Sequence, residues 1–384
     1  MPKLNPLVSS LSFPPIPIVQ KAARAYDGRL GPLIDLAQAV PGYPPHTDLL
    51  AWLSETAGNP ALLGYGDIEG EAVLRVAYSQ WQSEIYGASL GPDRVHITSG
   101  CNQAFIAAAL AVARPGDSIV LIEPYYFNHD TSLSMLGIHR KSVRADANTG
   151  FIPSIGAIED VIDQGVRALA LVTPNNPTGA VYSPEDLDAL YDLCVRHDLY
   201  LIVDETYRDF LDADRPPHNL FRKLDWEDHL VSLYSFSKSF CIPGHRLGAL
   251  TAGSRMIDAV AKIMDNLQIC APRPAQHALA RAITDLGSWR AETVREIEHR
   301  RKAMVAAFDG LKTWRLAAIG AYFAYVEHPF EEGTAEDVAA KLARERGVSC
   351  LPGSFFGSDE DRYLRFAFAN ADAERISHLR ERLV

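Results

Sequence analysis

Short runs of apolar residues alternate with amphipathic stretches through the middle of the chain. Apolar runs of about four to eight residues, bounded by polar residues or glycine, are typical of strands inside a parallel sheet. Such runs occur at residues 95–98, 118–122, 168–173, 199–203 and 230–234. We expect each to be a strand, and we expect residues 247–252 to form a further strand at the edge of the sheet.

Amphipathic stretches lie between these runs, and the clearest begins at Ser183. Ser183, Pro184 and Asp186 form a good helix start, and the residues that follow share one apolar face: Leu187, Leu190, Leu193 and Cys194. Repeated strand–helix units predict an α/β fold, with a mostly parallel sheet sandwiched by helices.

The two ends of the chain show different patterns. Residues 1–17 contain five prolines and should form an extended arm. After residue 256 long helical patterns dominate, and residues 289–311 suit a helical bridge between two lobes. The C-terminal segments then predict a smaller α+β lobe, with strands at 322–326 and 364–368 and helices at 335–345 and 373–383.

These patterns divide the chain into three parts. We assign residues 1–45 to an N-terminal arm and part of a small domain, residues 46–285 to a large domain, and residues 286–384 to the small C-terminal domain. A chain of 384 residues exceeds the usual size of one domain, which agrees with two lobes.

Composition and charge exclude several classes of partner. The net charge of −11 gives no general attraction to nucleic acid or to an anionic membrane. The longest apolar run, residues 104–113, is about half of a membrane span, and the N-terminus lacks the apolar core of a signal peptide. The five cysteines are scattered without a C-x-x-C pair, which argues against disulfides and zinc. We expect a cytoplasmic protein without a metal.

Polar clusters directly follow four of the predicted strands. They lie at residues 99–102, 174–179, 204–207 and 235–238. In open parallel sheets ligands bind beyond the carboxyl ends of the strands. These clusters are therefore expected to meet in one site.

The last cluster contains a lysine suited to covalent chemistry. Lys238 stands near two hydroxyls, Ser235 and Ser237, and Arg246 follows eight residues later. A lysine amine of lowered pKa attacks carbonyls, while hydroxyls and a guanidinium hold a phosphate. The combination suits a phosphorylated aldehyde such as pyridoxal phosphate (PLP).

Two other interpretations of this stretch exist. Ser235 and Lys238 also match the S-x-x-K signature of penicillin-binding acyl-transfer enzymes, but the S-D-N and K-T-G segments of that family do not occur in the chain. Taken alone, the stretch also fits a surface loop with an incidental lysine.

The other clusters supply groups that a pyridoxal ring needs. Asp204 can keep the pyridine nitrogen protonated, and Asn176 and Tyr207 can donate to the phenolic oxygen. The phosphate needs backbone N–H groups at a helix start, which the turn at Gly100, Cys101 and Asn102 offers.

Two further side chains complete the expected site. Tyr126 is a candidate plate for the ring face. Arg365 is the candidate for a substrate carboxylate, with Arg362 as its competitor. Each of these residues alone has an ordinary structural interpretation, and their joint order along the chain is the stronger signal.

The chain resembles the PLP-dependent aminotransferases of fold type I, class I/II, from about Ile34 to the C-terminus. The most specific segments are Asn176-Pro-Thr-Gly179, Asp204-Glu-Thr-Tyr207, Ser235-x-Ser-Lys238 and Gly244-His-Arg246-Leu-Gly248. The resemblance implies a large domain with a sheet of the seven-stranded type, PLP as cofactor, and transfer of an amino group from an L-amino acid to a 2-oxo acid.

The resemblance also implies roles for single residues. Lys238 carries the Schiff-base link and moves the substrate proton, while Arg365 pairs with the substrate carboxylate. Tyr65 reaches the phosphate of a neighbouring subunit, which implies a homodimer with its sites at the interface and makes the N-terminal arm a clasp or cover. Other residues bind the cofactor: Gly100, Cys101, Asn102, Tyr126, Asn176, Asp204, Tyr207, Ser235, Ser237 and Arg246.

Several positions depart from the family pattern or stay open. Ala39 stands where the family usually has a glycine near the substrate carboxylate, and Cys101 replaces a usual Gly or Ala. His129 is a candidate partner of Asp204, whereas His245 is expected to be exposed.

Substrate and reaction type are less sharply indicated. The Leu36-Ala-Gln38 and Pro44-Pro45 segments are closest to aminotransferases of aromatic or large neutral amino acids. A carbon–sulfur β-lyase or a PLP-dependent amino-acid oxidase would use the same lysine, aspartate and arginine. A sensor half of a transcription regulator would need a DNA-binding domain before Ile34, and the arm is too short for one.

Overall fold

A seven-stranded sheet forms the centre of the larger lobe in the computed structural model, which describes residues 2–211 and 215–384. Its spatial order is β2-β8-β7-β6-β5-β3-β4. The strands are β2 (Val95–Thr98), β3 (Ser118–Glu123), β4 (His139–Arg144), β5 (Val166–Val172), β6 (Tyr200–Asp204), β7 (Leu230–Ser235) and β8 (Gly248–Ala252). The predicted α/β fold with a mostly parallel sheet is confirmed.

Strand β8 differs from the prediction. It lies between β2 and β7 and runs antiparallel to both, instead of forming an edge. Every residue of β8 is buried, because apolar layers cover both faces of the sheet at this strand. A short buried run does not show from its sequence which strands will flank it.

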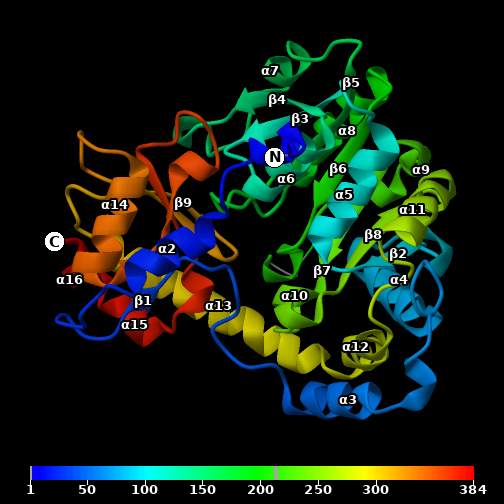
Figure 1. The fold of residues 1–384 in the computed structure, drawn as a ribbon, viewed down its shortest axis with the longest axis horizontal. Helices are drawn as coiled ribbons and strands as arrows, with labels where there is room; N and C mark the ends of the chain where they lie inside the picture. Colours follow the sequence, from blue (N-terminus) through cyan, green and yellow to red (C-terminus); the bar gives the residue numbers. More distant parts are fainter. Residues whose placement is uncertain (1, 212–214) are drawn as a thin grey trace.

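Successive side chains of the strands point to opposite faces of the sheet and pack into two separate apolar layers. Along β3, Val120 and Ile122 face the layer that includes α7 (Ile155–Glu159), α8 (Pro184–Arg196) and α9 (Trp226–His229). Ile119 and Leu121 face the other layer, which is built by α5 (Cys101–Val112), α6 (Phe127–Leu136) and α11 (Ser254–Leu267). Helices therefore cover both faces of the sheet (Figure 1).

A third apolar layer joins three helices at the end of the sheet that holds β2. They are α3 (Thr47–Ala57), α4 (Ala72–Tyr86) and α12 (Arg273–Asp285). A one-turn helix, α10 (Phe236–Ser239), follows β7 directly and packs on the same layer through Phe236.

The C-terminal lobe contains a four-stranded antiparallel sheet of order β12-β13-β10-β9. Its strands are β9 (Arg315–Gly320), β10 (Phe323–Glu327), β12 (Leu351–Pro352) and β13 (Tyr363–Phe366), and its helices are α14 (Ala335–Lys341), α15 (Ala373–Ser377) and α16 (Leu379–Leu383). The predicted strand at 364–368 ends at Phe366, because the chain turns into a 3₁₀ segment at Phe368.

Helix α13 (Gly287–Phe308) connects the lobes and corresponds to the helical bridge predicted at residues 289–311. It contacts α12 near its start and α15, α16 and β9 further along (Figure 1). The N-terminal segment joins the same lobe, since β1 (Ile34–Asp35) pairs in parallel with β11 (Val348–Ser349). The domain boundaries themselves stay a prediction.

The N-terminal arm is not fully extended as expected. Two helices begin at prolines, α1 (Pro6–Ser9) and α2 (Pro15–Ala23). Proline at the first helical position costs little because its missing N–H would have no helical partner there. Within the described residues, no helix combines the length and apolarity needed to cross a membrane.

Candidate active site

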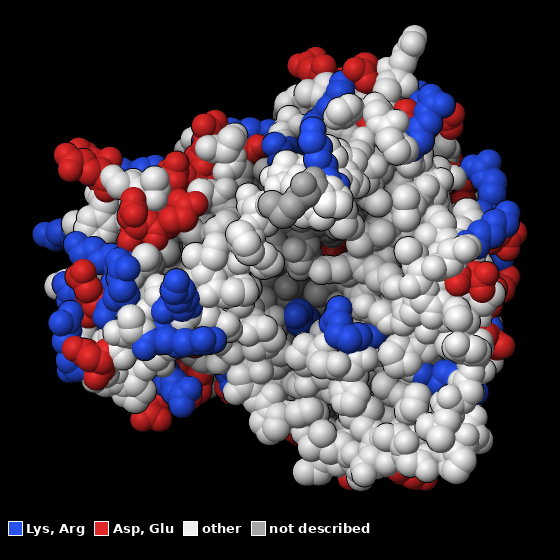
Figure 2. Space-filling view, in the orientation of Figure 1, with Lys and Arg blue, Asp and Glu red and all other residues white. Residues whose placement is uncertain are grey.

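A cavity of about 160 Å³ opens beyond the carboxyl ends of β5, β6 and β7. Figure 2 shows this face hollowed near its centre, with basic side chains at the hollow. Most of the predicted cofactor residues line the cavity: Cys101, Asn102, Tyr126, Asn176, Asp204, Tyr207, Ser235, Ser237, Lys238 and Arg246. Polar groups from the ends of five strands, β2, β3, β5, β6 and β7, therefore meet in one place.

Lys238 lies in the single turn of α10, immediately after β7. The hydroxyl of Ser235 caps this turn by accepting from the N–H of Ser237 at 3.4 Å. The Lys238 Nζ donates to the carbonyl of Ala39 at 2.8 Å. Burial, followed by the nearby charges of Arg246 and Arg365, lowers the pKa of Lys238 to about 8. A larger share of its amine is therefore neutral and nucleophilic near pH 7 than for an ordinary lysine.

Asp204 ends β6 and is held on both carboxylate oxygens. Its Oδ1 accepts from the backbone N–H of Thr206 at 3.0 Å and from the Thr206 hydroxyl at 2.6 Å. Its Oδ2 lies 3.3 Å from Nε2 of His129, whose ring stacks on Phe105 at 3.8 Å between centroids. This carboxylate is fixed in a buried position where it can favour a protonated ring nitrogen.

The turn at Gly100 forms a cradle for an anion at the start of α5. Gly100 has φ +87°, and a Cβ there would lie 2.2 Å from Nη2 of Arg246. A Cβ on Gly248 would lie 2.6 Å from the carbonyl carbon of Gly100. The missing side chains let Arg246 and the backbone N–H groups of the helix start converge, as a phosphate requires.

The departure at Cys101 does not disturb this cradle. Burial, followed by the charge of Asp204, raises the pKa of the Cys101 thiol well above its ordinary value. The thiol therefore stays protonated, and what the position offers an anion is its backbone N–H at the start of α5.

Three neutral donors lie around the same cavity. Burial raises the pKa of Tyr207 well above its ordinary value, so its hydroxyl stays protonated. Tyr126 accepts a hydrogen bond from Asn128 at 2.7 Å and donates to Asn102 at 3.4 Å. Asn176 presents its Oδ1 to Arg365, which leaves its amide N–H groups for another partner.

The structure separates the two candidate arginines. Arg365 is buried in β13, donates to Asn176 at 3.0 Å and also donates to the carbonyl of Ala37. Its Nε finds no partner among the described residues. Arg362 is exposed and lies 3.7 Å from Glu327, away from this cluster. Of the two, Arg365 is the one connected to the cavity.

Four predicted site residues do not line the cavity itself, namely Ala39, Tyr65, Gly100 and Arg365, and two residues that do line it were missed. Tyr65 is 79% exposed, and His245 is exposed as expected. Thr206 and Val172 line the cavity but were not predicted. A threonine two residues after an aspartate is a known turn signal and could have pointed to Thr206, whereas Val172 has no signal beyond its place at a strand end.

Comparison with known proteins gives the family. The family described as aminotransferase class I and II matches residues 31–383, nearly the whole chain. The chain belongs to this family. It is therefore an aminotransferase, an enzyme that transfers nitrogenous groups.

Relatives and solved structures agree with the assignment to the class I and II aminotransferases. The aromatic aminotransferase ISS1 of Arabidopsis thaliana is 30% identical over 345 residues, covering 87% of this chain and 84% of its own. An aspartate aminotransferase of Thermotoga maritima is 27% identical over 319 residues, covering 83% and 82%. A Thermus thermophilus aspartate aminotransferase mutant superposes with a TM-score of 0.90 at 25% identity, covering 100% of this chain and 99% of its own.

The family uses PLP, and the residues of this aminotransferase fit that group. A Cβ on Gly100 would collide with the Arg246 guanidinium, so the glycine lets this cation approach the backbone at the start of α5, where a phosphate would bind. Asp204 supplies a fixed buried carboxylate, and Lys238 supplies an amine of lowered pKa at the same cavity. Donors, carboxylate and amine are thus present in the combination that a phosphorylated pyridine aldehyde needs.

Proposed function

We propose that this aminotransferase binds PLP through Lys238 and moves the amino group of an L-amino acid to a 2-oxo acid in a ping-pong reaction. The observation that carries the proposal is the meeting of Lys238, its pKa lowered to about 8, with the fixed carboxylate of Asp204 at one cavity. When bound, PLP supplies the electron sink for the charge left at the amino-acid Cα.

The chain's own residues then have separate tasks. Lys238 holds the cofactor and moves the proton at Cα, for which an amine of lowered pKa is suited. Asp204 keeps the ring nitrogen protonated, and Tyr207 and Asn176 donate to the ring oxygen. Tyr126 covers a ring face.

The phosphate is assigned to the cradle around Gly100. Arg246 supplies the charged fork, and the start of α5 supplies backbone N–H groups through Cys101 and Asn102. Ser235 and Ser237 add hydroxyl donors from the lysine turn.

Arg365 is proposed to bind the substrate α-carboxylate. Its guanidinium has an Nε without a described partner, and burial is the main cause that lowers its pKa to about 10, so it stays charged near pH 7. Phe323 and Phe356 lie 5.0 and 5.4 Å from its guanidinium carbon. Ala39 lies beside Lys238 and narrows the space next to the carboxylate.

The amino donor is proposed to be aromatic or large and neutral. The sequence around residues 36–45 supports this choice. Relatives carry the names of both aromatic and aspartate aminotransferases. The enzyme is further proposed to work in the cytoplasm as a homodimer, without nucleic-acid or membrane partners, with the exposed Tyr65 reaching the phosphate site of the second copy.

A panel of amino donors tests the proposal. The PLP-loaded enzyme is mixed with phenylalanine, tyrosine, leucine, aspartate or glutamate, and the loss of visible cofactor absorbance is followed. We expect aromatic and large neutral donors to convert the cofactor to its amine form without an acceptor. A cysteine thioether is added to the panel, from which release of thiol, pyruvate and ammonia without that conversion would instead identify a β-lyase. Release of ammonia with consumption of dioxygen would identify an oxidase.

A further inference from the structure

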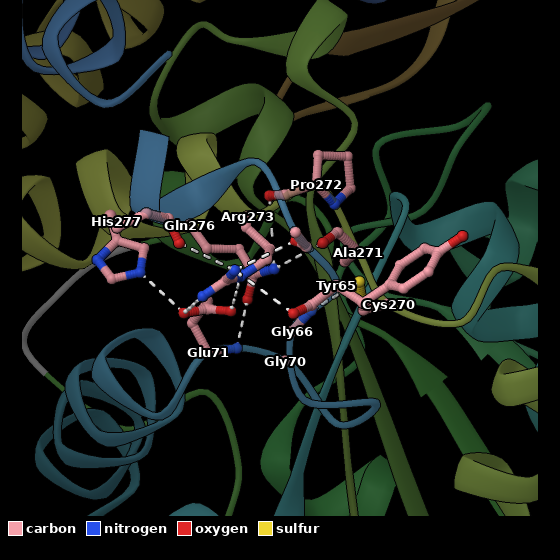
Figure 3. A network of polar contacts seen from close by, with 12 residues as sticks. Tyr65, Gly66, Gly70, Glu71, Cys270, Ala271, Pro272, Arg273, Gln276 and His277 are labelled. Atoms are coloured by element: carbon pink, nitrogen blue, oxygen red, sulfur yellow. Dashed lines mark hydrogen bonds and ion pairs between the residues drawn. The ribbon is translucent and has the colours of Figure 1, made fainter. Parts of the chain in front are cut away.

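The segment that carries Tyr65 contains no helix or strand. It runs from the end of a 3₁₀ turn, Pro60–Leu62, to the start of α4. Tyr65 extends outward from it and is 79% exposed (Figure 3). A segment of this kind needs partners elsewhere in the fold to keep one conformation.

Arg273 supplies those partners from the first residue of α12. Its Nη1 lies within hydrogen-bond distance of three backbone carbonyls, those of Ala61 at 3.2 Å, Gly64 at 3.1 Å and Tyr65 at 3.4 Å (Figure 3). One guanidinium nitrogen thus contacts the backbone before the tyrosine, at Ala61 and Gly64, and at Tyr65 itself.

Glu71 fixes the direction of the guanidinium. Its two carboxylate oxygens accept from Nε of Arg273 at 2.6 Å and from Nη2 at 3.3 Å, and His277 lies 2.8 Å from the second oxygen. Burial opposes ionisation, but the hydrogen bonds from Arg273 and His277 lower the pKa of Glu71. A cation at a helix N-terminus is unfavourable by itself, so this arginine depends on the carboxylate.

The loop backbone packs directly on this ion pair. A Cβ on Gly66 would lie 2.3 Å from Oε1 of Glu71 and 2.6 Å from Nε of Arg273. The N–H of Gly66 also donates to Sγ of Cys270 at 3.4 Å. The position of Tyr65 is therefore set from α12 and the turn before it, about two hundred residues away in sequence.

We propose that Arg273, oriented by Glu71, is a positioning residue that holds the Tyr65 loop in the shape that reaches the cofactor phosphate of a second copy of this chain. The inference rests on the proposed function, because it requires PLP and a homodimer. The planar fork of arginine is needed, since a lysine ammonium cannot grip both carboxylate oxygens and the carbonyls together.

A double-mutant cycle tests the proposal. The dissociation constant of PLP is measured by titration of the apo dimer for wild type, Tyr65→Phe, Arg273→Gln and the double variant. Each single change is expected to weaken binding about tenfold, and the double variant about tenfold rather than hundredfold, because both act through one contact. A purely structural role for Arg273 would give multiplied effects and overturn the proposal.

Three further variants define the result. Arg281→Gln removes an exposed arginine of the same helix that pairs with Asp285, and PLP affinity should be unchanged. Glu71→Gln keeps the shape of the side chain and should weaken PLP binding, which also serves if Arg273→Gln does not fold. Full affinity in Arg273→Lys would contradict the need for a fork. Failure of the wild type to bind PLP would reject the proposed function instead.

Discussion

The Oδ2 atom of Asp204 lies 3.3 Å from Nε2 of His129, and both side chains are buried. The backbone N–H and the hydroxyl of Thr206 donate to the other carboxylate oxygen. The carboxylate is thus fixed between a helix, α6, and the turn that follows β6. A buried anion held in this way can act on the charge of a bound ring without first reorienting.

Asp204→Asn is expected to lower kcat about a thousandfold, because a neutral amide does not hold a protonated ring nitrogen. Steady-state transamination with the best donor measures the loss. The side chain keeps its size, so the unfolding transition should move little. Activity within tenfold of wild type would contradict the role of Asp204.

Glu205→Gln provides the contrast at the next residue. Glu205 is buried, accepts from Ser232 at 2.7 Å and lies 3.2 Å from His218. We expect loss of about 3 kcal/mol in the free energy of unfolding, because the buried Arg208 loses a nearby counter-charge, with a much smaller change in kcat. Denaturant unfolding and turnover are measured on the same sample.

The reaction of the apoenzyme with unphosphorylated pyridoxal should follow the ionisation of Lys238. Because its pKa is lowered from 10.5 to about 8, the neutral amine predominates above pH 8, and the rate should fall about tenfold per pH unit below it. Removing the nearby charge in Arg246→Gln should move the midpoint to higher pH. A wild-type midpoint near 10.5 would contradict the assignment.

Arg365→Gln is expected to raise KM for amino acids about a hundredfold, because a bidentate contact to the carboxylate is lost. Arg362→Gln is the matched control, since that side chain lies at the surface beside Glu327 and should leave KM unchanged. Both variants are compared with an amine that lacks a carboxylate, for which Arg365→Gln should cost little. An equal loss with this amine would show that the effect is structural.

Gly100→Ala should weaken PLP binding roughly tenfold or more, because the new methyl group would lie 2.2 Å from Nη2 of Arg246. Gly116→Ala is the control for backbone strain. Gly116 has φ +92°, and a Cβ added there would have nothing within 4 Å, so alanine costs stability but not cofactor affinity. Equal PLP affinity in the two variants would contradict the cradle.

The sequence was most informative where local pattern decides structure. The buried runs became strands, and the polar residues after β5, β6 and β7 met in one cavity, because parallel strands bring their carboxyl ends to one edge. Contacts between distant segments were harder. Arg273 and Glu71 are 202 residues apart, and nothing in the sequence around either residue predicts that the two side chains form an ion pair. The place of β8 between β2 and β7 was missed for the same reason.

The place of β8 also has a consequence for the order in which the molecule assembles. Strand β2 has β8 as its only neighbour in the sheet among the residues that the structure describes, with Val95 opposite Thr251. While the chain is being synthesised, strand β2 and the turn at Gly100 that follows it therefore have no neighbouring strand to pack against until residue 252 has been made. Pairing over so long a separation is slow, so we expect that a nascent chain cannot hold the proposed cofactor early. We therefore expect loading with the proposed PLP only late in synthesis, after most of the larger lobe has been made.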